Sequence, residues 1–248
     1  MKFMKRILLC TLAVVATLAL DAQQLVRKRV YTPKQFAATR IELTGRNKPN
    51  GSYSRLREHV VVNDLPRPEV DEDLQLFIAE PAQGGYLGLW RTPLAANHYC
   101  FIAALYDEDK QLRDYFNLSR MLDDFDCELQ DIRSAADGRL YFNMACPSYS
   151  ENLKGKCSRL YCLDPEIAGI RWQTPYLTSN NIFILHDRYI ICGYGFTAEK
   201  DWLCLLDRET GRVLSKVPLP TAHTDLEIVG NRLYVTVYDD NIHEYEIK

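Results

Sequence analysis

The sequence lacks the motifs that mark many well-known catalytic and cofactor sites. It contains no C-x-x-C, no G-x-S-x-G, no Walker loop and no G-x-G-x-x-G, which leaves metal-ribbon, serine-hydrolase, nucleotide and dinucleotide sites without support. Its histidines are scattered, and the acidic run at 123–126 is more typical of a solvated loop than of a calcium site. The sequence therefore predicts no cofactor and no metal.

An excess of charge of one sign is also missing. The 30 Lys and Arg residues against 33 Asp and Glu residues give a formal charge of −3, which excludes a nucleic-acid binder that relies on phosphate neutralisation. Helical periodicity is nearly absent, and 47% hydrophobic residues exclude disorder. What remains is a β-rich chain with many turns.

The first 22 residues read as a secretory signal peptide. Lys2, Lys5 and Arg6 precede a fourteen-residue apolar run, Ile7 to Leu20, with Ala22 before the expected cleavage point. Such a run covers about 21 Å as a helix, less than the hydrocarbon core of about 30 Å. We therefore expect export to the periplasm or the extracellular space, and no membrane span once the signal is removed.

The cysteine count becomes odd when the signal is removed. Seven cysteines remain: Cys100, Cys127, Cys146, Cys157, Cys162, Cys192 and Cys204. Cys146 with Cys157, and Cys192 with Cys204, bracket equivalent loops of neighbouring repeats, so each pair is a disulfide candidate in an oxidising compartment. The alternative is that these cysteines are small buried hydrophobic residues.

A two-phrase repeat organises the body of the chain. The first phrase stands at 138–143 (GRLYFN), 187–192 (DRYIIC) and 230–235 (GNRLYV). The second stands at 159–172, 202–214 and 242–247, and a more divergent copy occupies 98–116. Each unit predicts four short strands separated by Asp, Gly and Asn turns. Four-stranded units that recur every 43 to 49 residues favour an all-β fold, a small β-propeller, over a β-sandwich with similar hairpins.

The second phrase also resembles a known family. Its best copy, with Leu160, Tyr161, Leu163, Asp164, Gly169 and Trp172, is similar to the repeats of quinoprotein-like (pyrroloquinoline-quinone-type) β-propellers. The resemblance implies the blade fold and carries no catalytic residue.

The last unit lacks its fourth strand. A propeller with an open seam exposes unpaired backbone groups, so we expect a strand from 24–44 to complete that blade, either Gln24 to Thr32 or Thr39 to Thr44. Residues 23–248 then form one domain, with units at about 74–117, 127–175, 180–217 and 223–248. Residues 45–73 suggest a fifth blade, with four blades or an incomplete ring as the alternative.

The connections in these units are unequal in length, and the long ones are expected on one face. Because sites usually lie on long loops of a rigid scaffold, we expect this long-loop face to bind through Trp90, Arg91, Tyr149, Lys154, Tyr194, Lys200 and Trp202. The alternative for the aromatic residues at strand ends is packing.

Two classes of function remain. The first is an exported, non-catalytic propeller that binds a protein or a carbohydrate through this face. The second is a small propeller hydrolase or lyase whose carboxylates and histidines converge at the central channel. Inward-pointing Asp, Glu, His or Asn side chains at one channel mouth would favour the enzyme.

Overall fold

The computed structural model describes residues 23–45, 47, 58–93, 100–121, 127–146, 149–196 and 198–248. The expected signal peptide, the acidic run at 123–126 and parts of the long loops lie outside the described residues.

The described chain is an all-β fold of four sheets, which we call blades 1 to 4 in chain order. Blade 1 contains five strands, β2 (His59–Val60), β3 (Gln75–Ala82), β4 (Gly85–Arg91), β5 (Phe101–Tyr106) and β6 (Leu112–Asn117). Blade 2 contains β7 (Glu128–Ser134), β8 (Leu140–Ala145), β9 (Arg159–Asp164) and β10 (Gly169–Gln173). In both blades β3 to β6 and β7 to β10 run as antiparallel meanders, and β2 adds to β3 in parallel.

Blades 3 and 4 repeat the meander. Blade 3 contains β11 (Asn180–His186), β12 (Tyr189–Tyr194), β13 (Asp201–Asp207) and β14 (Val213–Leu219). Blade 4 contains β15 (His223–Val229), β16 (Arg232–Val237), β17 (Ile242–Ile247) and β1 (Leu25–Tyr31). The helical segments are short: α1 (Pro33–Ala37), α2 (Leu118–Met121) and the 3₁₀ turns η1 (Ser150–Leu153) and η2 (Pro165–Ile167). None of the helices in the described ranges is long and apolar enough to cross a membrane.

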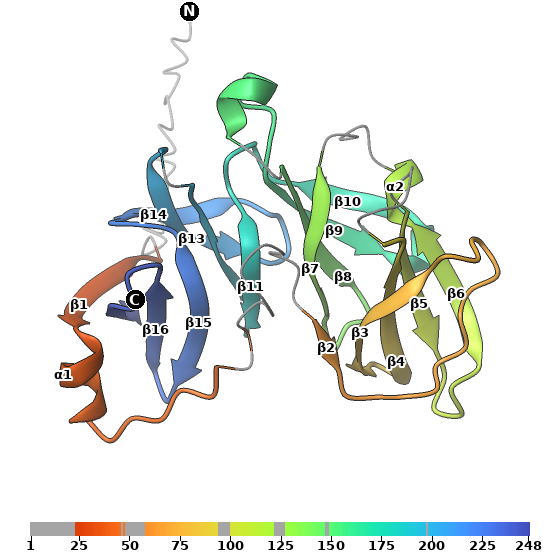
Figure 1. Cartoon of the computed structure of the whole chain (residues 1–248), viewed down its shortest axis with the longest axis horizontal. Helices are drawn as coiled ribbons and strands as arrows, with labels where there is room; N and C mark the ends of the chain where they lie inside the picture. The colour runs from red at the N-terminus through yellow and green to blue at the C-terminus, as the bar shows by residue number, and fades with distance from the viewer. Residues whose placement is uncertain are drawn as a thin grey trace, which may run out of the picture.

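The N-terminal strand completes the last blade, as expected. β1 pairs antiparallel with β17, and Figure 1 shows this red strand beside the blue C-terminal strands. Two backbone hydrogen bonds between Gln24 and Lys248, of 2.8 and 3.0 Å, extend the ladder beyond the strand ends. The other candidate, Thr39 to Thr44, forms no strand.

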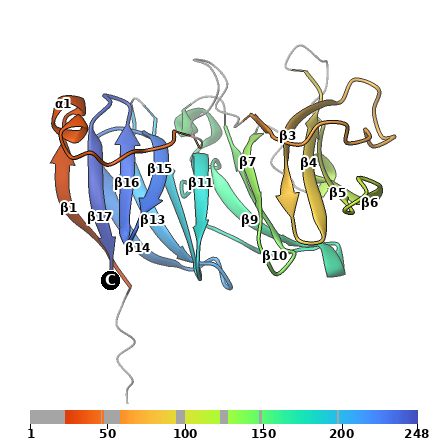
Figure 2. The same ribbon diagram turned by 90° about the horizontal axis from the view of Figure 1, so that it is seen from below.

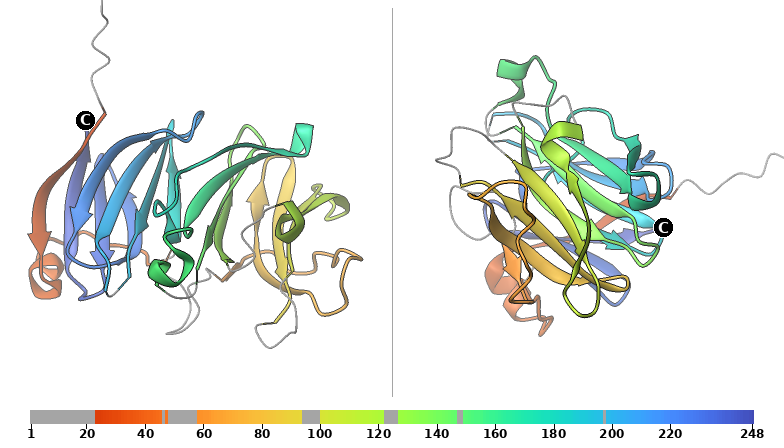
Figure 3. Two further views of the ribbon diagram at one scale, coloured as in Figure 1. Left: turned by 90° about the horizontal axis from the view of Figure 1, so that it is seen from above. Right: turned by 90° about the vertical axis from the view of Figure 1, so that its right-hand side faces the viewer.

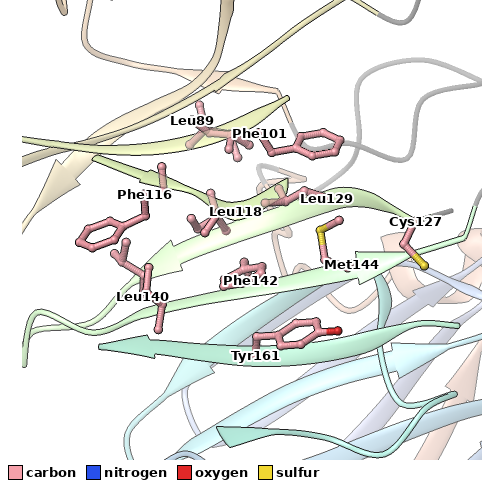
Figure 4. Close-up of a cluster of buried hydrophobic side chains, with 14 of the residues drawn as sticks. Leu89, Phe101, Phe116, Leu118, Cys127, Leu129, Leu140, Phe142, Met144 and Tyr161 are labelled. Atoms are coloured by element: carbon pink, nitrogen blue, oxygen red, sulfur yellow. The ribbon is translucent and has the colours of Figure 1, made fainter. Parts of the chain in front are cut away.

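The four blades follow one another in a row, with blade 1 at one end and blade 4 at the other (Figures 2 and 3). A large hydrophobic cluster joins blades 1 and 2; Leu89, Phe142 and Tyr161 are among its members (Figure 4). Two further clusters join blade 2 to blade 3 and blade 3 to blade 4. No hydrophobic cluster among the described residues joins blade 4 to blade 1, so the described sheets form a propeller of four blades in an incomplete ring.

The expected fifth blade is therefore wrong, and residues 61–74 show why. They place Leu65 and Leu74 against Ala79 and Ile102 on the outward face of blade 1. The Tyr106 hydroxyl donates to the carbonyl of Pro66 at 2.7 Å. The apolar residues of this segment thus cap a sheet face instead of forming strands of their own.

The outward face of blade 4 is capped in a similar way. Phe36 of α1 contacts Tyr31 and Tyr234 edge to face, with ring centroids 5.5 and 5.6 Å apart. Ile41 and Leu43 extend the cap along the sheet. Both end blades of the row consequently bury the faces that a neighbouring blade would cover in a closed ring.

The seven cysteines within the described ranges divide into one disulfide and five buried thiols. Cys146 and Cys157 are joined, with Cα atoms 5.5 Å apart. Cys192 and Cys204 are not joined, which corrects the second candidate pair; they lie directly opposite each other on β12 and β13 as buried thiols. A hydrogen bond between the two thiols holds the pKa of Cys192 above its ordinary value and that of Cys204 below it.

Candidate functional site

The long-loop face brings together the β8–β9 and β12–β13 connections of blades 2 and 3. In Figure 2 the η1 turn of the first connection stands at the upper edge of the row, at the same end as the second. Tyr149 is 41% exposed, and its ring lies 6.1 Å from that of Phe196 on the next blade. Phe196 in turn contacts Tyr194 edge to face at 5.8 Å. We call Tyr149, Phe196 and Tyr194 the aromatic shelf.

Two exposed lysines lie on the same connections as the aromatic shelf. Lys154 follows η1 with φ +53°, and its side chain is exposed. Lys200 precedes β13 and is exposed as well. The two connections therefore carry an exposed aromatic ring and two exposed cations.

The other residues predicted for this face pack instead of facing solvent. Trp90 is buried and donates its indole N–H to the Tyr106 hydroxyl at 2.9 Å. Arg91 is only 4% exposed, and its guanidinium lies 4.1 Å from the centre of the Phe77 ring. Strand-end side chains were expected to reach the loops, but in blade 1 they turn into the sheet packing, so neither residue is available to a partner.

Tyr194 and Trp202 also serve mainly to pack blade 3. Tyr194 is buried at the base of the shelf, and its hydroxyl donates to the Glu199 carboxylate. Trp202 is half-buried between two hydrophobic clusters, and the Lys216 ammonium lies 4.9 Å from its ring centre. Of the seven predicted residues, Tyr149, Lys154 and Lys200 are the ones whose side chains are exposed.

A buried carboxyl group lies beneath the shelf. Asp201 is 8% exposed, and its Oδ1 atom has no hydrogen-bond partner among the described residues. A Cβ at Gly195 would stand 1.9 Å from that atom, so only glycine fits there. Burial raises the pKa of Asp201 to about 6, the Phe196 N–H opposes the shift, and the Glu199 carboxylate adds to it.

Asp201→Asn is therefore expected to stabilise the protein at neutral pH. Because the folded-state pKa lies above the unfolded value near 3.8, ionisation of Asp201 opposes folding once the pH rises past about 4, and the penalty is complete above pH 6. The gain in free energy of unfolding should be about 1–2 kcal/mol at pH 7.5 and vanish at pH 4. Urea denaturation at both pH values measures it. Asp109→Asn, at an exposed turn, is the control, and a gain that does not depend on pH would contradict the explanation.

Sequence reasoning missed a set of buried polar residues, Gln130, Asn143, Asn181 and His223, which we call the polar column. Three of the four lie on the first strands of their blades. In each of β3, β7, β11 and β15 the register with the next strand shifts once, and the residues at the shifts are Phe77, Gln130, Asn181 with Ile182, and Thr224. Such irregularities re-aim side chains and free backbone groups that need partners. The repetition of the shift at one place in every blade is a signal that strand alternation alone does not reveal.

The polar column joins neighbouring blades through buried hydrogen bonds. Gln130 of blade 2 accepts the N–H of Asn181 of blade 3 at 2.6 Å. The Asn143 amide donates to the Asn181 carbonyl at 2.7 Å and accepts the Asp131 N–H at 2.8 Å. Asn181 donates onward to the His223 carbonyl of blade 4 at 3.2 Å. These inward polar side chains thus connect three blades.

A pocket of about 410 Å³ opens where the first strands of all four blades meet. Its polar lining residues include His59, Glu80, Arg133, His186 and Glu227. Asp131 pairs with Arg133 at 2.9 Å. Thr44 and Gly45 donate to Glu227, at distances from 2.7 to 2.9 Å, and so anchor the N-terminal segment across the pocket.

The groups able to hold a metal are dispersed. In the part of the chain that the structure describes, no three His, Cys, Asp or Glu side chains gather as metal ligands.

Comparison with known proteins gives similarity of fold. No family model matches the chain, and no curated protein matches it. Among solved structures, the chain is similar to the WD40 propeller domain of Doa1, with 9% identity over 69% of this chain and 63% of that one and a TM-score of 0.42. It thus spans less than two thirds of the Doa1 chain.

Two further structures illustrate the range of the similarity. BamB from Moraxella catarrhalis has 12% identity, coverage of 71% and 70% and a TM-score of 0.32. The GH43 endo-arabinanase from Bacillus licheniformis has 11% identity, coverage of 70% and 72% and a TM-score of 0.32. These similarities concern the fold alone. The quinoprotein-type resemblance is supported only at the level of a β-propeller.

Proposed function

We propose that the chain is an exported, non-catalytic binding module that holds a protein or carbohydrate partner on its long-loop face. The observation that carries the proposal is the aromatic shelf, where exposed Tyr149 packs against Phe196 of the next blade, on two connections that also carry the exposed Lys154 and Lys200. Exposed tyrosines are typical of binding surfaces, because the ring offers apolar area and the hydroxyl offers a hydrogen bond. Export to the periplasm or the extracellular space rests on the signal-like pattern of residues 1–22.

The face is tested with a triple variant, Tyr149→Ser with Lys154→Ser and Lys200→Ser. The immobilised chain is exposed to extracellular protein fractions of its host and to a glycan array, and the captured partner is then titrated. Because the change removes the exposed ring and both cations, affinity should fall at least about tenfold.

The matched control is Ile167→Ser with Arg188→Ser on the opposite, short-turn face. Both residues are exposed, so the control removes similar surface without touching the shelf. A partner that binds the triple variant as tightly as the wild type, or that is lost only with the control, would place the binding surface elsewhere.

A hydrolase or lyase is the second candidate, and the pocket shared by the four blades favours it. Glu80 and His59 line that pocket beside Arg133, and polar groups gathered in one pocket support this candidate. The Asp131 and Glu227 carboxylates, however, are occupied by structural contacts. Turnover of a glycoside or ester panel that disappears in Glu80→Gln would favour this candidate over binding alone.

A further inference from the structure

The junction between blades 2 and 3 shows how two neighbouring blades close on the short-turn face. Arg139, at the β7–β8 turn, pairs with Glu209 in the β13–β14 turn of blade 3. Trp172 of β10 lies against the same turn, because a Cβ at Gly211 would come 2.4 Å from its indole ring. The Arg171 guanidinium adds a second contact to Glu209 at 3.6 Å. An indole ring and a guanidinium thus fill this junction.

The same junction between blades 1 and 2 contains a cavity instead. Its volume is about 560 Å³, within the range of about 300–1,000 Å³ typical of small-molecule sites. The β3–β4 turn, β5 and β6 form one wall, and the β7–β8 and β9–β10 turns form the other. The apolar part includes Tyr86, Leu105 and Leu140.

Strand register identifies the residue of blade 1 that corresponds to Trp172 of blade 2. Trp172 of blade 2 lies opposite Cys162 on the neighbouring strand. Asp114 of blade 1 lies opposite Leu105. Cys162 stands two residues before Asp164, and Leu105 stands two residues before Asp107. Each of these aspartates opens the outer turn of its blade, which joins the last two strands, so Trp172 and Asp114 occupy corresponding positions. A short carboxylate in blade 1 replaces the indole of blade 2.

A counterpart of Arg139 is also missing from blade 1. Arg139 immediately precedes Leu140, and Leu140 pairs with Leu163, the residue before Asp164. Tyr86 holds the matching place in blade 1, and the residue before it is Gly85. Glycine therefore occupies the position from which an arginine would reach across the junction.

The carboxylate that would receive the guanidinium is nevertheless present. Glu166 follows Asp164 by two residues, as Glu209 follows Asp207. It lines the cavity, and within the described residues its carboxylate makes no hydrogen bond or ion pair. Blade 2 thus retains the acceptor, whereas blade 1 lacks both side chains that would cover it.

The charge of the walls agrees with a missing cation. The carboxylates of Asp114 and Glu166 line the cavity against the guanidinium of Arg113. Two further carboxylates in the lining are already paired with arginines: that of Asp137 lies 3.9 Å from both Arg139 and Arg208, and that of Asp164 lies 2.9 Å from Arg171. A cation on a flat apolar body matches both the acidic rim and the space that an indole fills in the next junction.

We infer that the cavity between blades 1 and 2 binds an organic cation in which a guanidinium or ammonium group is attached to an aromatic body. The ligand is either a free aromatic amine or neighbouring Trp and Arg side chains of a peptide. This site lies on the short-turn face and is independent of the aromatic shelf.

Calorimetric titration with three probes tests the site. Tryptamine represents the free amine, tryptophanyl-arginine amide represents the peptide, and N-acetyl-tryptophanyl-glutamate is the acidic control. We expect the cationic probes to bind with a Kd below about 1 mM and the acidic probe not to bind. Binding of the dipeptide amide alone supports the peptide source, whereas tighter binding of tryptamine supports the free amine. Absence of binding by both cationic probes overturns the inference.

Three variants locate the binding. Asp114→Trp places an indole where Trp172 stands in blade 2 and should weaken binding more than about tenfold, because the ligand's space is filled. Asp114→Leu, a smaller apolar replacement that also removes the carboxylate, serves if the larger residue prevents folding. Glu166→Gln should weaken binding about two- to fivefold, as expected for an exposed ion pair.

Glu108→Gln, an exposed acid on the β5–β6 turn outside the cavity, is the control and should leave the affinity unchanged. Probe binding that persists unchanged in both Asp114 variants would place the ligand elsewhere and overturn the inference.

Discussion

A chain that begins at Thr32 will show no cooperative unfolding transition, whereas a chain that begins at Gln23 will unfold cooperatively. The difference is β1, which pairs with β17 along its whole length. Leu25 is buried in the cluster between blades 3 and 4, and the Tyr31 hydroxyl donates to Glu244 at 2.7 Å. Burial of two such side chains contributes about 3–6 kcal/mol, a large part of a typical stability of about 5–15 kcal/mol.

The measurement is thermal and urea denaturation followed by circular dichroism. Loss of β1 also leaves β17 as an unpaired edge and removes the anchor of α1, so we expect aggregation of the shortened chain. A peptide of residues 23–31 added in trans should restore part of the transition. If the shortened chain unfolds with the same midpoint and slope as the longer one, β1 does not hold the last blade.

Asn143→Ala is expected to lower the free energy of unfolding by about 3–5 kcal/mol. The Asn143 side chain is fully buried and makes three hydrogen bonds, to the Asp131 N–H, the Ser179 hydroxyl and the Asn181 carbonyl. Alanine leaves these groups buried without their partner, which costs about 1–3 kcal/mol for each group that water does not reach.

Urea denaturation measures the effect, with Asn241→Ala as the matched control. The Asn241 side chain contacts only Asp239 in an exposed turn, so its loss should cost less than about 0.5 kcal/mol. A small loss at Asn143, similar to that at Asn241, would show that the polar column does not join blades 2 and 3.

The fold was largely predictable because each copy of the sequence repeat corresponds to one blade, with its strands in chain order. The aspartate-led outer turns formed as expected: Asp207 accepts from the Thr210 backbone and hydroxyl, and Gly211 has φ +70°. The missing fourth strand of the last unit correctly pointed to Leu25–Tyr31. The blade count was not predictable, because apolar residues such as Leu65 fit a strand and a cap equally well in sequence.

The long connections could be located from the sequence, but the orientation of the side chains beside them could not. Sequence cannot tell whether a strand-end residue such as Arg91 reaches solvent or lies over Phe77. The polar column escaped notice because the register shifts that turn Gln130 and Asn181 inward arise from pairing between strands. The cavity was hidden for the same reason, since Asp114 corresponds to Trp172 only through register.

Hydrogen exchange at the seam tests the central claim most directly, namely that an N-terminal strand holds the last blade of a four-blade row. We predict that the β1 amides paired with β17 exchange at least about a hundredfold more slowly than in an unstructured peptide, together with the amides of β16 and β17. Unprotected exchange throughout residues 24–31, while β7 to β14 remain protected, would contradict the account.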